Sequence, residues 1–393
     1  MSQARAIAFF PWWINEEPIS IGPIRLRPYA KGRLPGNLDQ VEQADIDGVM
    51  QAYANRPGHR VKKATLLEVD DWHSGADPEG SLTRLFLAKE ALGFAGLASR
   101  KLFKGHFGYC CFDNFIMVVQ RFRPGKAGTF AYTIRRRDGS STNLWSSDQF
   151  TFQRPLHVSD PLGCVPLDEA LVCMLMAPEI PAHWLEAIRE FNRANTDSAD
   201  IPVHVELVMM KSAFEQLLDI DEKARSFADA LDQILPPVQT SSSPPPGPLR
   251  QRWLSRFDRF TRPIHSWAKE FCIRRGAAAH GNDGGSHHVW SDHAHLAFAS
   301  FLFPLLLKKM AADARTYTIS EDDLDRLARI EQHLEHDPFG YREDDQEEPG
   351  NQHPWAEIDF DIRVRANSRR IDRGMRAALE AGLAAALAQE QSK

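Results

Sequence analysis

The stretch Phe271-Cys-Ile-Arg-Arg-Gly-Ala-Ala-Ala-His280-Gly281 ends an apolar helical run with an arginine, four further residues and a histidine. Arg275 carries a permanent positive charge, and a histidine such as His280 titrates near neutral pH. Held at a fixed spacing, these two side-chain types are the minimal pair for metal-free chemistry on a phosphodiester. The stretch therefore predicts a helix that ends in a candidate phosphate-binding and proton-transfer site.

The residues before this stretch predict where its helix begins and which face it buries. Thr261 can cap the helix, and Pro263 suits its first turn. One apolar face follows, and Arg275 continues it; its members are Ile264, Trp267, Ala268, Phe271 and Cys272. Residues five apart in an unbroken helix project ~140° apart, so Arg275 and His280 of one chain would not converge. Either Gly276 loosens the helix, or two subunits related by a twofold axis each supply part of one site.

The second half of the chain shows helical spacing of apolar residues throughout. The expected helices cover residues 167–176, 181–195, 201–219, 221–235, 250–280, 289–313, 320–336 and 367–389. A proline- and serine-rich stretch at 236–249 cannot continue a helix and is expected to form an inserted loop. The last of these helices has an apolar stripe, which could dock on the bundle or on a second subunit.

The first half is rich in β-branched and aromatic runs typical of strands. These runs cover residues 6–12, 24–29, 61–69, 115–122, 130–136 and 150–157, with one helix expected at 79–101. Turns at Pro124-Gly125 and Asp138-Gly139 predict an antiparallel meander. The expected fold class is α+β: a strand-rich mixed N-terminal domain at 1–160, followed by an all-α helical bundle at 161–393.

The composition and the start of the chain exclude several classes of protein. The 393 residues exceed the usual size of one domain, and a hydrophobic content of 43% suffices for buried cores. A net charge of −6 argues against a protein that coats nucleic acid non-specifically. Five scattered cysteines without a CxxC pair are typical of reduced thiols. The start of the chain lacks a signal-peptide pattern, and no uninterrupted apolar run reaches ~18 residues, so a cytoplasmic protein without a membrane segment is expected.

Two segments of the helical half resemble the HEPN family (higher eukaryotes and prokaryotes nucleotide-binding), and in particular its Apea-like branch. They are Pro202-Val-His-Val-Glu-Leu-Val-Met-Met-Lys-Ser-Ala-Phe-Glu-Gln-Leu-Leu218 and Ile273-Arg-Arg-Gly-Ala-Ala-Ala-His-Gly281, and the resemblance covers about residues 165–315. It implies a helical bundle that dimerises and places an arginine and a histidine in a shared cleft. Many members of the branch are metal-independent endoribonucleases of toxin–antitoxin or antiphage systems.

The resemblance also implies roles for single residues. Arg275 matches the arginine of the family pattern, His280 the histidine, and Glu215 the acidic residue of the earlier helix. Arg274 could replace Arg275, because the family tolerates five intervening residues. The residue after the arginine, often Asn in the family, is Gly276 here.

The expected reaction is RNA cleavage through attack of the 2′-hydroxyl on the adjacent phosphate. A histidine can move the protons and a guanidinium can stabilise the charged phosphorane, so the reaction needs neither a metal nor a cofactor. The expected partners are an RNA substrate, a second copy of the chain and an antitoxin or trigger protein. Four further residues are expected to contact the RNA: Arg274, Asn282, His287 and His288.

Two other interpretations remain open at this point. An arginine and a histidine near a helix C-terminus also serve to satisfy the last carbonyls, which would suit a non-catalytic HEPN module that binds RNA, nucleotide or a protein. Alternatively, the histidine-rich stretch from His280 to His295 could hold a divalent metal, with His288 and Asp292 on one helical face and His293 or Asp283 completing the site. In that case the protein would be a metal-dependent hydrolase.

Overall fold

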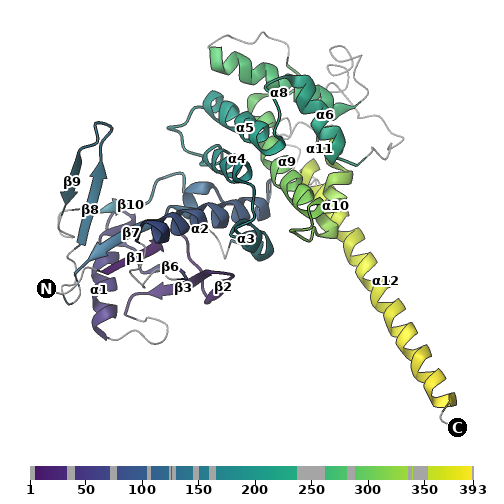
Figure 1. Cartoon of the computed structure of the whole chain (residues 1–393), viewed down its shortest axis with the longest axis horizontal. Helices are drawn as coiled ribbons and strands as arrows, with labels where there is room; N and C mark the ends of the chain where they lie inside the picture. Colours follow the sequence, from purple (N-terminus) through teal and green to yellow (C-terminus); the bar gives the residue numbers. More distant parts are fainter. Residues whose placement is uncertain are drawn as a thin grey trace, which may run out of the picture. The chain divides into compact units, whose positions relative to one another are not determined.

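The computed structural model (Figure 1) describes residues 5–32, 40–70, 78–103, 108–123, 125, 130–144, 150–158, 165–236, 262–280, 288–334, 339 and 353–391. The chain divides into two compact units, Met1–Asp219 and Ile220–Lys393. The first is mixed α+β and the second is helical, as the sequence predicted.

The N-terminal unit is built on a seven-stranded sheet with the order β2-β3-β6-β1-β7-β8-β9. Its strands are β1 Arg5–Phe10, β2 Ile19–Ile21, β3 Ile24–Ala30, β6 Lys63–Val69, β7 Val118–Phe122, β8 Phe130–Arg135 and β9 Ser141–Leu144. Each neighbouring pair is antiparallel. A smaller sheet joins β4 Tyr53–Arg56 to β5 His59–Arg60 and, in parallel, to β10 Phe152–Gln153.

The sequence predicted the long strands and the consecutive strands β7 and β8, which pair antiparallel. The third strand expected in the meander, at 150–157, is instead β10, which pairs in parallel with β4 in the smaller sheet, and β9 lies beside β8 in its place. Gly139 takes a positive φ of 83° in the turn that joins β8 to β9, a conformation that glycine adopts without steric cost. The sequence missed β2, β4, β5 and β9, and it missed helix α1 at Gln40–Met50. These strands have two to four residues, too few for an alternating apolar pattern to stand out.

Both faces of the large sheet pack on helices. Ile46, Val49 and Met50 of α1 belong to a core cluster that also holds Phe9 and Leu66 of the sheet. Helix α2, Pro78–Ser99, packs on β6 and on the short helix η1, Phe112–Phe115.

Three helices that the sequence assigned to the second domain belong to the first unit: α3 Glu169–Leu175, α4 Ala182–Arg193 and α5 Val203–Leu218. The reason lies in contacts of α4 and the residues after it. Phe94 and Phe191 pack edge to face, and Asn192 donates a hydrogen bond of 2.7 Å to Glu90. Arg100 donates another to Asn195. The boundary therefore falls after Asp219, whereas the sequence predicted it at residue 160.

The C-terminal unit is entirely helical in its described part. Its helices are α6 Ala224–Ile234, α8 Pro263–His280, α9 Asp292–Asp313, α10 Glu321–Ala328, α11 Ile330–Leu334 and α12 Pro354–Gln391. Helix α12 begins thirteen residues before the expected start at 367. The expected loop at 236–249 lies outside the described residues except for Pro236, and so does the part of the expected 250–280 helix before Arg262.

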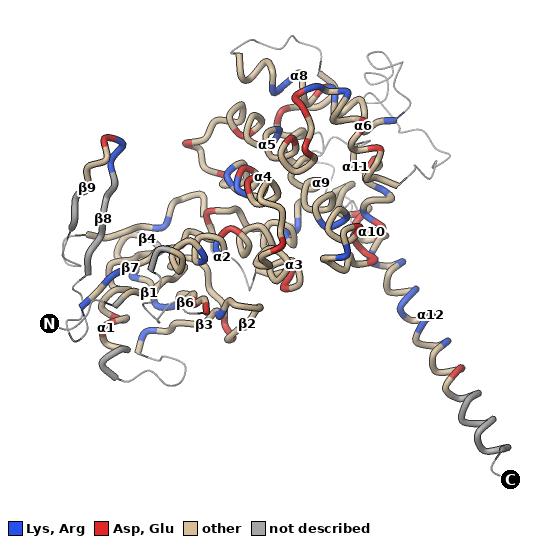
Figure 2. The backbone as a smooth tube through the Cα atoms, in the orientation of Figure 1, with Lys and Arg blue, Asp and Glu red and all other residues tan. Residues whose placement is uncertain are grey.

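Ion pairs join α12 to α10. Asp359 accepts a hydrogen bond of 3.2 Å from Arg326, Arg373 pairs with Glu321 at 2.7 Å, and Arg369 pairs with Asp325. Figure 2 shows the acidic residues on α10 beside the arginines of α12. The face of α12 that carries these ion pairs also carries three buried apolar side chains, those of Trp355, Ile362 and Ala366.

Helix α9 is long and apolar enough to cross a membrane, with a mean hydropathy of 1.3 over 18 residues. The sequence had predicted no such segment. However, 78% of that window is buried, because α9 is the core helix of its unit. Lys308 on α9 is also buried, where it forms an ion pair of 3.0 Å with Asp323. This burial is consistent with a soluble protein.

Candidate active site at the end of helix α8

Helix α8 begins at Pro263, as the sequence predicted, and buries the predicted apolar face. Ile264, Trp267, Ala268 and Phe271 have no exposed surface, whereas Cys272 is only partly buried. Trp267 and Phe271 stack with their ring centroids 5.0 Å apart, and Trp267 meets Phe298 of α9 edge to face. The expected cap, Thr261, lies outside the described residues.

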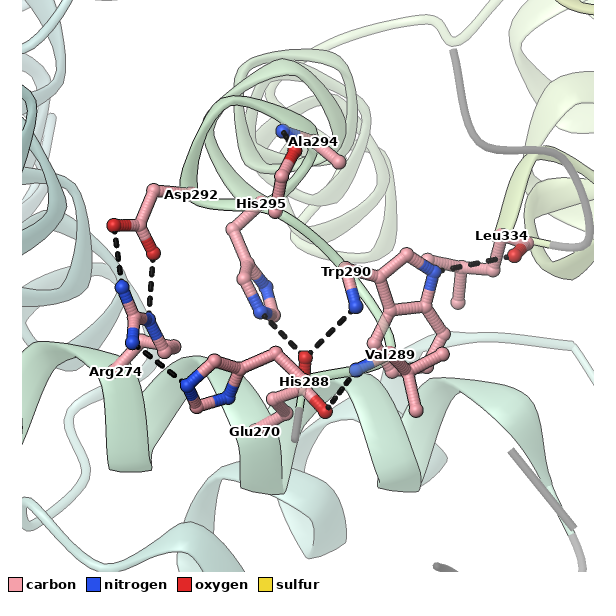
Figure 3. A network of polar contacts seen from close by, with 10 residues as sticks. Glu270, Arg274, His288, Val289, Trp290, Asp292, Ala294, His295 and Leu334 are labelled. Carbon is pink, nitrogen blue, oxygen red and sulfur yellow. Dashed lines mark hydrogen bonds and ion pairs between the residues drawn. The ribbon is translucent and has the colours of Figure 1, made fainter. Parts of the chain in front are cut away.

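A buried carboxylate fixes the beginning of α9 to the middle of α8 (Figure 3). Glu270 has no exposed surface and accepts hydrogen bonds from the backbone N–H groups of Val289, at 3.1 Å, and Trp290, at 2.9 Å. Its carboxylate also lies 3.3 Å from Nε2 of the buried His295. The Trp290 indole donates to the carbonyl of Leu334. The contacts from Val289, Trp290 and His295 satisfy the Glu270 carboxylate, which would otherwise be costly to bury.

A second ion pair lies one helical turn further along α8. Arg274 donates to Asp292 from Nε and from Nη2, each at 2.6 Å, and its Nη1 lies 2.8 Å from Nε2 of His288. Figure 3 shows the guanidinium between these two partners. Ser291 caps α9 by accepting a hydrogen bond from the N–H of Ala294.

Both carboxylates in this network are held in their ionised form. Burial raises the pKa of Glu270, but hydrogen bonds from His295, Trp290 and Val289 outweigh it, so the pKa lies below its ordinary value. Burial also raises the pKa of Asp292, but the hydrogen bonds and charge of Arg274 lower it overall. The network is therefore ionic at neutral pH.

The predicted pair, Arg275 and His280, lies on the last turns of α8. Arg275 is partly buried, and its Nε is buried without a hydrogen-bond partner among the described residues. His280 is exposed and ends the helix. Helix α8 runs unbroken through Gly276, so this glycine does not loosen it. The two side chains therefore project ~140° apart within one chain.

Glu215, the third expected catalytic residue, lies on α5 in the N-terminal unit, whereas Arg275 and His280 lie in the C-terminal unit. Its carboxylate forms an ion pair of 2.8 Å with the buried Lys211, four residues earlier. Glu206 on the same helix is half-buried, and burial, followed by the charge of Asp197, raises its pKa to about 7.

The expected metal ligands have other partners. His288 and Asp292 both contact Arg274, whose positive charge opposes a metal ion at that position. His293 is exposed and lies 5.9 Å from the ring of Phe339. No group of three or more His, Cys, Asp or Glu side chains could hold a metal in the described part of the chain.

Two expected RNA contacts, Asn282 and His287, lie outside the described residues, as does Asp283. The sequence missed the roles of Glu270 and His295. One signal was present, because Glu270 stands inside the apolar run of α8, where a carboxylate needs a partner. The spacing of the residues around Glu270 did not indicate that its partner, His295, lies 25 residues later in the chain.

No family model, no curated protein and no solved structure matches the chain.

Proposed function

We propose that the chain is a metal-independent endoribonuclease of the HEPN type, acting in bacterial antiphage defence or as a toxin. One observation carries the proposal. Of the two adjacent arginines, Arg274 is neutralised by Asp292, whereas no described residue bonds to the buried Nε of Arg275. Of these two arginines, Arg275 is thus the one available to bind a phosphate.

In the proposed reaction, His280 removes the proton of an RNA 2′-hydroxyl, and the oxygen attacks the adjacent phosphorus. The bond to the 5′-oxygen breaks, and the leaving oxygen takes up a proton. The products are a 2′,3′-cyclic phosphate and a 5′-hydroxyl. Arg275 stabilises the charge that develops on the phosphorane. No metal or cofactor takes part.

The proposal includes a homodimer. Because α8 is continuous, Arg275 and His280 of one chain diverge, and a site that uses both needs a twofold axis. Arg274, Asn282, His287 and His288 are proposed RNA contacts, and an antitoxin or trigger protein is a proposed partner.

The test incubates the purified protein with total RNA and tRNA in excess EDTA. We expect cleavage that Arg275→Ala and His280→Ala each reduce at least 100-fold, in line with the usual worth of a general acid–base. Two exposed residues elsewhere provide controls: His204→Ala on α5 and Arg225→Ala on α6 should leave the rate unchanged.

A full rate in either site variant would contradict the assignment. Cleavage that EDTA abolishes would instead support the metal-dependent hydrolase that uses the His280–His295 stretch.

A second candidate, a non-catalytic HEPN module that binds RNA, nucleotide or a protein, is favoured by the divergence of the two side chains. In that case the wild-type protein would bind labelled RNA without cleaving it, and Arg275→Ala would weaken the binding.

A further inference from the structure

Helix α12 has a second apolar face, which no described part of its own unit covers. Five large apolar side chains on it are between 46% and 73% exposed: Phe360, Val364, Ile371, Met375 and Leu379. At about 100° per residue they fall within an arc of roughly 100°. This stripe lies opposite the face that Trp355, Ile362 and Ala366 bury, so α12 docks on its own unit through one side only.

The ion pairs that anchor α12 stop well before the helix does. Arg373 is the last of its described side chains that forms an ion pair with another helix, whereas the helix continues to Gln391. Most helical stability in proteins comes from packing of an amphipathic face, and this part of the helix packs on no described part of its own unit. A partner that covers the exposed stripe would supply the missing burial.

Charges along one edge of the stripe identify that partner. Asp361, Arg365, Asp372 and Arg376 are exposed and lie within about 60° of one another around the helix. Their signs alternate, and their spacing of four, seven and four residues reads the same in both directions. When a second copy of the helix runs in the opposite direction, each acidic side chain of one copy therefore stands opposite a basic side chain of the other. The edge is thus complementary to a second copy of itself in the antiparallel direction.

We propose that α12 pairs antiparallel with α12 of a second copy of this chain. In this register Asp361 faces Arg376 of the partner subunit, and Arg365 faces the partner subunit's Asp372. In the same register Phe360 and Leu379 of the partner subunit are offset by two residues, about 3 Å along the helix axis, and Val364 and the partner subunit's Met375 are offset by the same amount. All five exposed apolar side chains are then covered, over a span of about 30 Å.

Neighbouring side chains are compatible with close packing of the two helices. The other edge of the stripe carries the small residues Gly374 and Ala378 and the polar Asn367. The helical units lie on the outer sides of the pair, because each docks on the face of α12 opposite the stripe. Among the described ion pairs, only Asp361 has a competing partner, Arg329, at 3.9 Å. The Asp361 side chain is largely exposed and the distance is at the outer limit of an ion pair, so this contact contributes little.

Analytical ultracentrifugation of the full chain tests this inference, which stands whether or not the chain cleaves RNA. We expect a dimer for the wild type, and a dissociation constant at least tenfold higher for Ile371→Glu. Leu324→Glu, at an exposed apolar residue of α10, should leave the dimer intact. Circular dichroism and the melting temperature establish that each variant is folded.

Charge exchange tests the register and the direction. Arg365→Asp alone should weaken the dimer, because it places an aspartate against Asp372 of the partner subunit, and the double variant R365D/D372R should restore it. Arg370→Asp, on the far side of the helix from this edge, serves as the control.

Three results would overturn the proposal. They are a monomeric wild type at tens of micromolar, a double variant no tighter than R365D, or a monomer that sediments with phosphatidylserine vesicles through Ile371. The last would assign the stripe to an anionic membrane instead.

Discussion

Arg274 binds Asp292 through two parallel hydrogen bonds of 2.6 Å, one from Nε and one from Nη2, and thereby ties the end of α8 to the first residue of α9. The two helices are separated in the sequence by residues 281–291. About a quarter of each side chain is exposed, so water reaches the pair only in part. Such bidentate, charge-assisted bonds are stronger than neutral hydrogen bonds.

Replacing Asp292 by Asn should therefore lower the free energy of unfolding by about 1 to 2 kcal/mol. Arg274→Lys should cost a similar amount, because an ammonium cannot make both bonds. Urea denaturation followed by circular dichroism measures the change. Asp229→Asn, in an exposed pair with Arg225 at 3.8 Å, is the matched control and should have no measurable effect. Equal stability of Asp292→Asn and the wild type would contradict this role.

Glu270 should make the protein sensitive to acid. Its pKa is lowered in the folded chain, so its ionised form contributes stability above the ordinary carboxyl pKa of 4.5. That contribution is lost as the pH falls through the lowered value. Glu270→Gln should cost about 3 kcal/mol at pH 7, because it leaves buried groups unsatisfied, and much less at pH 3. The free energy of unfolding, measured from pH 7 to pH 3, should fall more steeply for the wild type than for the variant; parallel curves would refute this.

The fold could be predicted from the sequence where local patterns were strong. Helix α8 begins at Pro263 as expected, because proline and the apolar spacing after it act within the helix itself. The boundary between the two units, at Asp219, depends on contacts between residues that are far apart in the sequence. The bond between Asn192 and Glu90 joins residues 102 apart, and no spacing rule reports such a contact.

The same limit applies to the candidate site. Spacing alone left Arg274 and Arg275 as alternatives, because both precede His280 at distances that the HEPN family tolerates. What separates them is Asp292, a residue 18 positions after Arg274 and on another helix. A contact of that kind depends on how α8 and α9 pack, which the sequence indicates only through the apolar face that they share.

Glu206 should have the opposite pH dependence to Glu270. Its pKa of about 7 in the folded chain lies above the ordinary 4.5, so folding favours the protonated carboxyl. Stability due to this group is full below pH 4.5 and declines as the pH rises towards 7. Glu206→Gln, which stays neutral, should stabilise the protein by about 1 kcal/mol at pH 8 after allowance for solvent screening, and by nothing at pH 4.5. Thermal melts at the two pH values provide the comparison, and a variant that is less stable at pH 8 would show that the carboxylate has a partner.

Two helical glycines should respond in opposite ways to a side chain. A Cβ at Gly276 would meet no atom of the described residues within 4 Å, whereas a Cβ at Gly93 of α2 would lie 2.7 Å from Cδ2 of Phe112. Gly276→Ala should therefore stabilise the protein by about 0.5 to 1 kcal/mol, because alanine is the better helix former. Gly93→Ala should destabilise it by about 1 to 3 kcal/mol through overpacking. Urea denaturation measures both changes.

The space at Gly276 also bears on the proposed RNA cleavage, because it leaves room for an asparagine, which the HEPN family often has at the matching position. Gly276→Asn should fold normally and should retain or increase RNA cleavage in EDTA. Gly276→Ala separates the effect of the amide from that of helix propensity. A loss of cleavage in the folded Asn variant, with Gly276→Ala still active, would mean that the RNA backbone approaches this glycine too closely for a longer side chain.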